Sequence, residues 1–445
     1  MDNSSIKLNI TGLTHEGKGV GRHDGLAVFV KDALPGEIVR ARLHKVKKNY
    51  AEAILEEILE VSPFRIDGKC LNHKKCGGCQ LLHLNYREQL KEKQNIVINA
   101  LQRIGGFSKV TVNECLGMDD PWGYRNKIIF QVGRKEDKEK GLKLGFYEEN
   151  SNDFVPGKGC LLVSLDVRRL ADKVEKLINV YNLKQLKRIL IRQSTFNKEI
   201  LLGLIFSGKT HDRFKLEKMV GEIKNHSDKL ISIIEFIVAD SKLPWKAQSK
   251  VLYGRDYFIE ELNSKRFIIS ANSFFQVNSL QAEKLYGTVV EFVGTEDAKT
   301  IFDLYCGTGT IAIQLSDMAE RVYGIETLEE ALGDARRNAD LNKTTNVEFL
   351  LGKAEVKAKK LFEKGLQPDV VVVDPPRKGC HPDLLNSILT VNPKKVIYVS
   401  CNPATLARDL TILSQSYTAK EVQPVDMFPH TAHVETVALM SKVEK

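Results

Sequence analysis

Five short apolar runs, separated by helix-length segments, constrain the fold of this chain more than any other feature. They are TIFDLY, RVYGIE, NVEFLLG, DVVVVD and KKVIYVS, and all lie within residues 271–445. Such alternation predicts a doubly wound parallel sheet, and a sheet of this kind binds ligands at the carboxyl ends of its strands. We therefore expect an α/β domain over 271–445, with its functional site at those ends.

Three of these strand ends carry residues suited to a nucleotide-like cofactor. Gly307 and Gly309 follow the first strand and allow the backbone to come close to a ligand. Glu326 ends the second strand, where a carboxylate can accept hydrogen bonds from both ribose hydroxyls. Because Ala312 stands at the third position of a dinucleotide-binding motif, the glycines alone do not exclude an NAD enzyme. The fourth strand ends at Asp374 in DPPRKG, and the combined pattern resembles class I S-adenosylmethionine-dependent methyltransferases.

The cysteine in VSCNPATLARDL, at the end of the fifth strand, indicates nucleophilic chemistry. Carbon 5 of uridine is too poor a nucleophile to take a methyl group unaided, but a thiolate that adds to carbon 6 turns the ring into an enolate. Cys401 is placed for that addition. The reaction also needs a base for the carbon-5 proton, and Glu435 in HVETVALM is expected near the same sheet edge. The alternatives are a buried structural thiol and a solvated strand carboxylate.

Four cysteines form a second candidate site. Cys70, Cys76 and Cys79 lie close together, whereas Cys160 is distant in the sequence. In a reducing compartment, disulfides are not expected among the eight cysteines of the chain. Four thiolates suit either zinc or an iron–sulfur cluster, and the identity of the ligands does not distinguish the two.

Residues 1–61 predict a small OB-like β-barrel of five short strands. Within it, IVRARLH alternates apolar and basic side chains, so one face is expected to be basic: Val39, Ala41 and Leu43 against Arg40, Arg42 and His44. Folds of this type often bind RNA. The alternative is a barrel whose charges only keep the protein in solution.

Residues 62–270 predict a central α+β or α/β domain without a catalytic motif of its own. Arg125, Lys127 and the run RKEDKEKGLK are expected in solvated charged loops rather than on phosphate. The net charge of +9 leans towards a polyanionic partner without deciding it. Neither a membrane-spanning run nor a secretory signal is visible, so we expect a cytoplasmic protein with no membrane partner.

Together these motifs resemble the bacterial 5-methyluridine RNA methyltransferase family, and most of all its ribosomal RNA branch. GKGVGR and LPGE resemble a TRAM domain, and SFFQVN, DLYCGTGT, GIE, DPPRKG, VSCNPATLARDL and HVETVAL follow in the family's order. The resemblance implies that Cys401 is the nucleophile and Glu435 the base. It also implies an S-adenosylmethionine site formed by these residues: Gln276, Tyr305, Thr310, Glu326 and Asp374.

The resemblance further implies that the substrate is large-subunit (23S) ribosomal RNA and that the four cysteines hold a [4Fe-4S] cluster. A flipped uridine, held by the TRAM and central domains, and a monomeric enzyme are expected. Phe274 or Phe275 could stack on RNA, with at least one of them in the core. The alternatives are a transfer RNA uridine-C5 methyltransferase and a non-catalytic RNA-binding assembly factor; an NAD enzyme ranks lowest.

Overall fold

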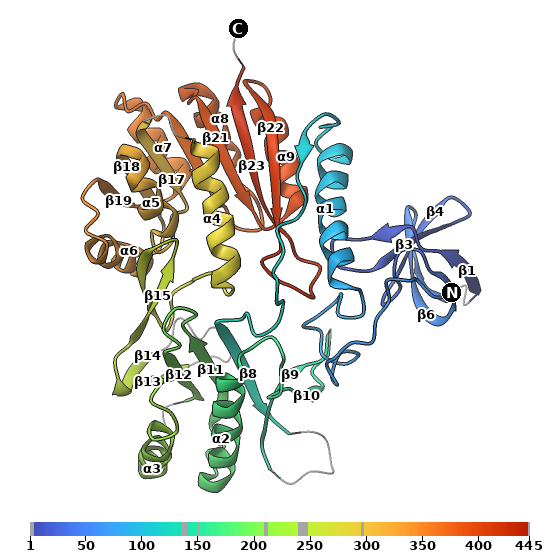
Figure 1. Cartoon of the computed structure of the whole chain (residues 1–445), viewed down its shortest axis with the longest axis vertical. Coiled ribbons are helices and arrows are strands. Elements are labelled where there is room, and N and C mark those ends of the chain that lie inside the picture. Colours follow the sequence, from blue (N-terminus) through green and yellow to red (C-terminus); the bar gives the residue numbers. More distant parts are fainter. Residues whose placement is uncertain are drawn as a thin grey trace.

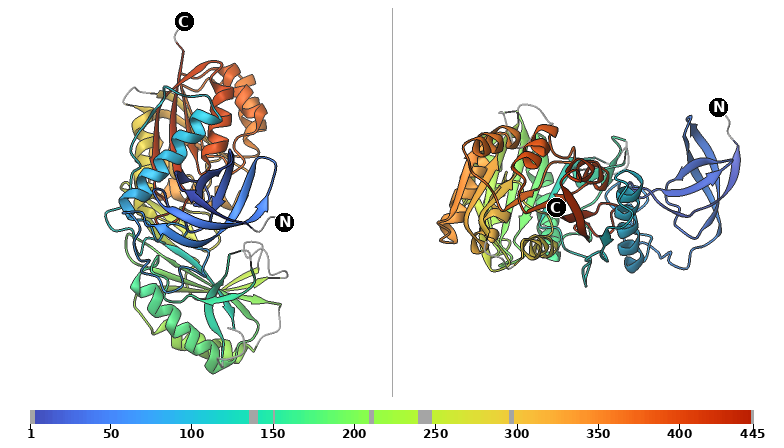
Figure 2. Two further views of the ribbon diagram at one scale, coloured as in Figure 1. Left: turned by 90° about the vertical axis from the view of Figure 1, so that its right-hand side faces the viewer. Right: turned by 90° about the horizontal axis from the view of Figure 1, so that it is seen from above.

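The computed structural model describes residues 4–134, 141–149, 151–208, 212–238, 248–294 and 298–443. In Figure 1 the large C-terminal sheet lies above a smaller central sheet, and the N-terminal strands lie to one side of the long helix α1 (Tyr86–Arg103). The view from above in Figure 2 shows the N-terminal domain projecting away from the rest of the molecule.

The N-terminal domain is a six-stranded sheet in the order β1-β5-β6-β4-β3-β2. The prediction of five strands was one short, because the two-residue strand β2 also pairs with β3. Val39 and Ala41 of β5 are fully buried, as their alternation predicts. The strands are β1 (Ser5–Asn9), β2 (Gly12–Leu13), β3 (Gly19–His23), β4 (Leu26–Val30), β5 (Ile38–Val46) and β6 (Tyr50–Glu60).

The expected basic face of β5 is largely neutralised. Arg40 forms an ion pair with Glu57, and Arg42 forms one with Glu56, both across to β6. The sequence pattern of β5 does not reveal these partners, because they lie on the neighbouring strand β6. The barrel therefore presents paired charges at this place rather than a bare cationic surface.

The central domain is a seven-stranded sheet in the order β10-β9-β8-β11-β12-β13-β14, with α2 and α3 packed on it. Its hairpin β15–β16 shares a hydrophobic core with the C-terminal sheet, through Phe258 and Phe267 against Ile301 and Val372. The elements are β8 (Lys127–Gly133), β9 (Lys143–Tyr147), β10 (Phe154–Pro156), α2 (Leu165–Tyr181), β11 (Leu186–Gln193), β12 (Ile200–Ser207), α3 (Arg213–Lys224), β13 (Leu230–Val238), β14 (Gln248–Gly254), β15 (Tyr257–Leu262) and β16 (Lys265–Ser270).

The C-terminal domain is the predicted doubly wound one, with strand order β19-β18-β17-β20-β21-β23-β22-β7. All neighbours are parallel except β23, which runs antiparallel to β21 and β22. The strands are β7 (Thr111–Val112), β17 (Ala298–Leu304), β18 (Ala319–Glu326), β19 (Val347–Leu351), β20 (Val370–Val373), β21 (Lys395–Ser400), β22 (Tyr417–Val425) and β23 (Glu435–Lys442). The helices are α4 (Ser279–Val293), α5 (Thr310–Leu315), the 3-10 turn η2 (Ser316–Met318), α6 (Glu329–Leu341), α7 (Ala354–Glu363), α8 (Pro382–Val391) and α9 (Pro403–Leu413).

The chain leaves β17 towards β18 on one side and returns to β20 on the other. The ends of β17 and β20 therefore flank the switch point of the sheet, where doubly wound folds bind ligands. This places the glycine loop and Asp374 beside each other.

Helix α1 and strand β7 pack on the C-terminal sheet, although they precede the expected boundary at residue 271. Ile96, Val97 and Leu101 of α1 share a buried cluster with Leu406 and Leu410 of α9. Strand β7 forms the outer edge of the same sheet. The domain boundaries at residues 61 and 270 remain predictions. The boundary at 270 assigns α1 and β7 to the central domain, although both pack on the C-terminal sheet. Within the described residues no helix is long and apolar enough to cross a membrane.

Candidate active site

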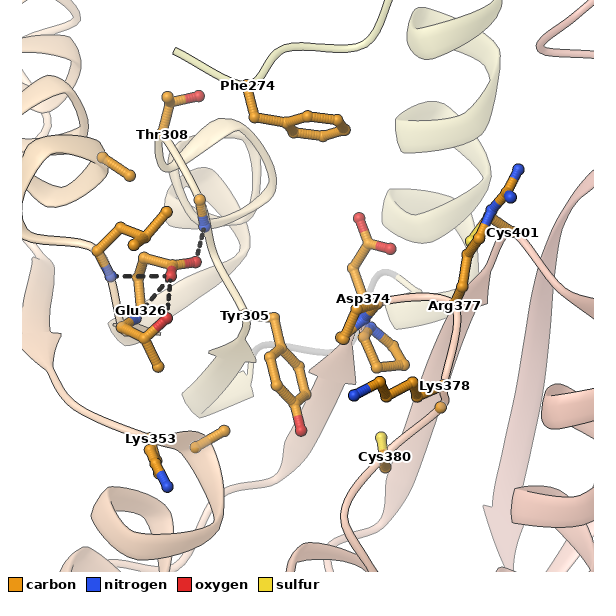
Figure 3. Close-up of a pocket in the computed structure, with 18 of the residues that line it drawn as sticks. Phe274, Tyr305, Thr308, Glu326, Lys353, Asp374, Arg377, Lys378, Cys380 and Cys401 are labelled. Atoms are coloured by element: carbon orange, nitrogen blue, oxygen red, sulfur yellow. Dashed lines mark hydrogen bonds between the residues drawn. The ribbon is translucent and has the colours of Figure 1, made fainter. Parts of the chain in front are cut away.

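A cavity of about 1590 Å³ opens at the carboxyl ends of the C-terminal strands. It is lined by the ends of β17, β18, β20 and β21 and by the first residue of β23. The segment 270–276, which follows β16, also contributes to the lining. Of the seven residues predicted for catalysis and cofactor binding, six line it: Gln276, Tyr305, Glu326, Asp374, Cys401 and Glu435. Figure 3 shows Asp374 between Cys401 on one side and Tyr305, Thr308 and Glu326 on the other.

Thr310 does not line this cavity. It is the first residue of α5 and is buried, and its hydroxyl donates to the Tyr286 hydroxyl at 3.5 Å. The helix turns Thr310 inward and leaves Thr308 facing the cavity instead. The role predicted for Thr310 in cofactor binding therefore has no direct geometric support.

Cys401 and Glu435 stand next to each other because β21 and β23 are neighbours. The last residue of β21, Ser400, pairs with Thr436, so Cys401 and Glu435 follow at adjacent positions beyond that pair. Cys401 also directly precedes Asn402, the N-cap of α9, whose side chain accepts a hydrogen bond from the Ala404 N–H at 3.0 Å. The strand–cap junction fixes the thiol at the amino end of a helix, a position that favours a thiolate.

Burial and neighbouring carboxylates raise the pKa of the groups in this cavity. The pKa of Cys401 is raised to about 11 by burial and then by Glu435 and Asp374, and Arg377 opposes the shift. The pKa of Glu435 is raised to about 8 by burial and by Asp374. Burial raises the pKa of Asp374 to about 7. One base and one thiol thus share a poorly hydrated space with a cation, a common arrangement in active sites.

Backbone N–H groups hold the Glu326 carboxylate in one orientation. One carboxylate oxygen accepts hydrogen bonds from the Thr327 N–H at 2.6 Å and the Leu328 N–H at 3.0 Å, and the other accepts from the Gly307 N–H at 3.2 Å (Figure 3). A Cβ atom added to Gly307 would meet nothing within 4 Å, so the loop leaves open space beside this carboxylate. The arrangement fits a nucleoside whose hydroxyls approach Glu326.

Tyr305 has a φ of +73°, a conformation that bulky residues rarely adopt. Its N–H and that of Cys306 donate to the Ile325 carbonyl, at 2.9 and 3.0 Å, so the turn after β17 is tied to β18. Strain of this kind persists only where the surroundings enforce it, and it is common at functional sites. The turn at Tyr305 and Cys306 places the glycine loop at the switch point of the sheet.

Asp303 is a second carboxylate behind the glycine loop. It is fully buried, one oxygen accepts from the Ala312 N–H at 2.9 Å, and the other has no hydrogen-bond partner among the described residues. Its pKa is raised to about 8 by burial and by Asp374. Asp303 therefore holds the start of α5 in place from behind the glycine loop.

Several lining residues were not predicted from the sequence. Arg377 and His433 lie in the motifs DPPRKG and HVETVAL without a predicted role, and Lys353 lies in none of the quoted motifs; the approach of separate loops brings all three to the cavity. The expectation that at least one of the two phenylalanines lies in the core is confirmed, because Phe275 is 4% exposed. Phe274 is 75% exposed at the cavity, and its stacking on RNA remains a prediction.

The four cysteines of the second site lie within electrostatic range of one another. The pKa of Cys79 is raised to about 12 by burial and by the charges of Cys160, Cys76 and Cys70. The backbone of Cys76 forms an isolated antiparallel β-bridge with Glu148. This bridge brings the segment that carries Cys70, Cys76 and Cys79 to the part of the central domain near Cys160. In the part of the chain that the structure describes, no three His, Cys, Asp or Glu side chains are arranged as metal ligands.

Arg125 lies beside these thiols rather than in a solvated loop, so that expectation was wrong. Its charge lowers the pKa of Cys79 and Cys160, and its Nε is buried without a hydrogen-bond partner among the described residues. Lys127 is also half-buried, and burial followed by Arg192 lowers its pKa to about 7. Most of RKEDKEKGLK, residues 135–140, lies outside the described residues. A half-buried guanidinium, whose Nε has no partner within the described part of the chain, therefore lies beside the thiols of Cys79 and Cys160.

Two family models match the chain. Residues 85–443 match the tRNA (uracil-5-)-methyltransferase model, and residues 1–55 match the TRAM domain. A protein of Bacillus cereus described as an RNA methyltransferase is 41% identical over 454 aligned residues, covering 100% of this chain and 98% of the relative. A Clostridium acetobutylicum protein with the same description is 40% identical, with the same coverage.

A solved structure is similar over almost the whole chain. It is the tRNA (uracil-54, C5)-methyltransferase of Pyrococcus abyssi in complex with S-adenosyl-L-homocysteine, with a TM-score of 0.75 and 27% sequence identity. The match covers 98% of this chain and 100% of the other. The chain therefore belongs to the tRNA (uracil-5-)-methyltransferase family of S-adenosylmethionine-dependent RNA methyltransferases and carries an N-terminal TRAM domain.

Proposed function

We propose that the protein forms 5-methyluridine in large-subunit ribosomal RNA through a covalent adduct between a cysteine and carbon 6 of the target uridine. The observation that carries this proposal is the juxtaposition of Cys401 and Glu435 at neighbouring strand ends, in one cavity with Glu326 and the glycine loop. A thiol and a carboxyl group are the two groups that carbon-5 methylation of a pyrimidine requires.

Cys401 acts first. Its sulfur forms a bond to carbon 6, and the electron pair of the carbon 5–carbon 6 double bond moves into the ring as an enolate. The amino end of α9 and the positive charge of Arg377 stabilise the Cys401 thiolate, whereas the carboxylates of Glu435 and Asp374 destabilise it. The ring then carries a nucleophilic carbon 5.

When bound, S-adenosylmethionine would supply an electrophilic methyl group to carbon 5; the bond from that methyl group to the sulfonium sulfur would break, and S-adenosylhomocysteine would leave. Gln276, Glu326 and the loop at Gly307 would hold this cofactor. Asp374 lies between them and Cys401, so its carboxyl group is within reach of both the cofactor and the uridine ring (Figure 3).

Glu435 completes the reaction. It takes the carbon-5 proton, the electron pair of that bond restores the double bond, and the carbon 6–sulfur bond breaks to return the thiolate of Cys401. A carboxylate with a raised pKa is a stronger base than a solvated one, which suits this step. The product is 5-methyluridine and the enzyme is regenerated.

The test uses RNA containing 5-fluorouridine together with S-adenosylmethionine. Fluorine cannot leave carbon 5 as a proton does, so a true nucleophile stays attached to the RNA. We expect a cofactor-dependent protein–RNA adduct that is absent in Cys401→Ala. Methylation of ordinary RNA without any adduct on the fluorinated RNA would contradict the proposal.

Transfer RNA is the second candidate substrate, because the Pyrococcus abyssi protein is a tRNA (uracil-54, C5)-methyltransferase. Transcripts of 23S ribosomal RNA and of transfer RNA, incubated separately with labelled S-adenosylmethionine, distinguish the two. Methylation of transfer RNA alone would overturn the ribosomal substrate and leave the proposed chemistry intact.

We also propose a metal centre on Cys70, Cys76, Cys79 and Cys160, as a [4Fe-4S] cluster with zinc as the alternative. Its support is the thiol-rich donor set beside the half-buried Arg125. Methyl transfer requires no electron, so the centre would hold structure or position RNA. Iron, sulfide and zinc analysis of anaerobically purified protein tests the proposal, and protein with none of the three contradicts it.

A further inference from the structure

The loop that precedes Glu435 is held from outside the cavity by a part of the chain that the reaction does not use. Residues 426–434 connect β22 to β23, and Phe428 and His433 of this loop line the cavity. Its outer side contacts α1 and the segment that follows the cysteine cluster. The loop that leads to the base is therefore held by contacts made well away from the cavity.

The first contact is a buried ion pair. Lys93 of α1 pairs with Asp426, and both side chains are 0% exposed. Lys93 Nζ also donates to the Phe428 carbonyl at 3.1 Å, and the Tyr86 hydroxyl donates to the second oxygen of Asp426 at 2.8 Å. A buried charge pair with these further hydrogen bonds fixes the start of the loop in one orientation.

The second contact is Gln89, which is fully buried in α1 one turn before Lys93. Its Oε1 accepts a hydrogen bond from the His430 N–H at 3.0 Å, and its Nε2 donates to the carbonyls of Leu81 at 3.0 Å and Leu84 at 2.8 Å. The Leu81 N–H donates in turn to the His430 carbonyl at 2.9 Å. Trp122 stacks on the His430 ring with 4.1 Å between centroids. One amide thus joins the segment after the cysteines to the middle of the base-bearing loop.

We propose that Gln89 is a positioning residue for the base, acting through His430 and the 426–434 loop. The inference rests on the proposed function, in which Glu435 removes the carbon-5 proton. If the amide is lost, His430 can shift and the carboxylate shifts with it. A displacement of about 1 Å can slow a step about 100-fold.

Such a shift has a specific consequence. Addition of Cys401 and transfer of the methyl group come before the step that needs the base, so they continue. Elimination is slowed, and the methylated uridine remains bonded to the Cys401 sulfur. A general loss of folding or RNA binding would instead reduce the adduct.

Gln94 supplies a matched control on the same helix. It is half-buried, and its Nε2 also donates to two backbone carbonyls, those of Val112 at 3.1 Å and Asn113 at 2.9 Å, in β7 and the residue that follows it. Gln94 lacks the bond that Gln89 makes to the base-bearing loop, in which Oε1 accepts from the His430 N–H. Gln89→Leu and Gln94→Leu therefore remove the same kind of bonds from different partners. Glu435→Gln provides the reference for a missing base.

The experiment incubates each variant with S-adenosylmethionine and ordinary, uridine-containing RNA, using whichever candidate RNA the wild-type protein methylates. The covalent protein–RNA fraction is measured on denaturing gels beside the turnover rate. We expect Gln89→Leu and Glu435→Gln to accumulate adduct with turnover reduced about 10- to 100-fold, and Gln94→Leu to behave like wild type.

The outcomes separate the two proposals. Accumulation in Glu435→Gln without accumulation in Gln89→Leu overturns the positioning role, as does equal accumulation in Gln94→Leu. No accumulation in Glu435→Gln overturns the proposed base itself, and this inference falls with it. Should Gln89→Leu fail to fold, Trp122→Leu removes the stack on His430 from a half-buried site and is judged by the same criteria.

Discussion

Two carboxyl groups and one cation, those of Asp374, Glu435 and Arg377, line the cavity with the Cys401 thiol and act on its pKa. Asp374 raises the pKa of both Asp303 and Glu435 and contributes to the raised pKa of Cys401. Arg377 acts in the opposite direction on Cys401 and Glu435. The balance between the positive charge of Arg377 and the negative charges of the carboxylates sets the pH range in which Cys401 is a thiolate while Glu435 is unprotonated.

The rate at which free 5-methyluridine forms should therefore rise with pH. Glu435 must be unprotonated to act and its pKa is about 8, and Cys401, with a pKa of about 11, must lose its proton to add to the ring. The groups that face them, Asp374 and Arg377, do not reverse the direction. Single-turnover rates measured from pH 6 to pH 9 should increase through about pH 8. A profile that falls over this range would contradict the assignment of the base.

Loss of Arg377 should move that profile to higher pH. The guanidinium lowers the pKa of Cys401 and of Glu435, so Arg377→Ala should leave less thiolate at neutral pH and slow adduct formation about 10-fold. Lys378→Ala is the matched control, because Lys378 is also exposed and also lines the cavity. Equal effects of the two substitutions, without a change in the pH profile, would show a general loss of RNA attraction instead.

The junction between β21 and α9 is the element that fixes the nucleophile. Asn402 caps α9, and its Nδ2 donates to the Arg377 carbonyl at 3.3 Å, so the same side chain ties the loop after Asp374 to the loop of Cys401. Asn402→Ala should cost about 1 kcal/mol of stability and also lower the rate of adduct formation.

Asp212→Ala provides the comparison, because Asp212 caps α3 in the central domain through the Lys215 N–H at 3.1 Å. Thermal unfolding should shift by a similar amount in both variants, whereas only Asn402→Ala should slow adduct formation. A parallel loss of rate in Asp212→Ala would mean that cap stability alone controls the activity.

The molecule as a whole is joined through α1. This helix packs on α9, and its contacts reach the loop before Glu435, while the segment just before it carries three of the four clustered cysteines. A fragment of residues 271–445 would expose the surface that Ile96, Val97 and Leu101 cover, and would lose the strand β7 at the sheet edge.

We therefore expect the fragment 271–445 to aggregate or remain unfolded, and the fragment 62–445 to fold. The N-terminal domain has a buried cluster of its own, formed by Val30, Val39, Ala41 and their neighbours, so its removal should leave the rest intact. Circular dichroism and size-exclusion chromatography of the two fragments test this. A folded 271–445 fragment would show that α1 is dispensable for the C-terminal sheet.

The sequence by itself determined the parts of the protein that depend on local pattern. Apolar runs and helix periodicity predicted the strands and helices of the C-terminal sheet, whereas the sequence left open which of Phe274 and Phe275 is exposed. The motifs at strand ends predicted Cys401, Glu326 and Asp374, because a doubly wound fold brings such ends to one edge.

Only the tertiary structure decided what depends on neighbours from distant segments. The pairing of β21 with β23 brought Glu435 beside Cys401, and the helical start of α5 turned Thr310 away from the cavity. The partners of Arg40 and Arg42, the burial of Arg125 beside the thiols, and the contact of Gln89 with His430 lie between residues far apart in the chain. Periodicity reports which face of an element is buried, whereas the identity of the residue packed against that face is set by packing alone.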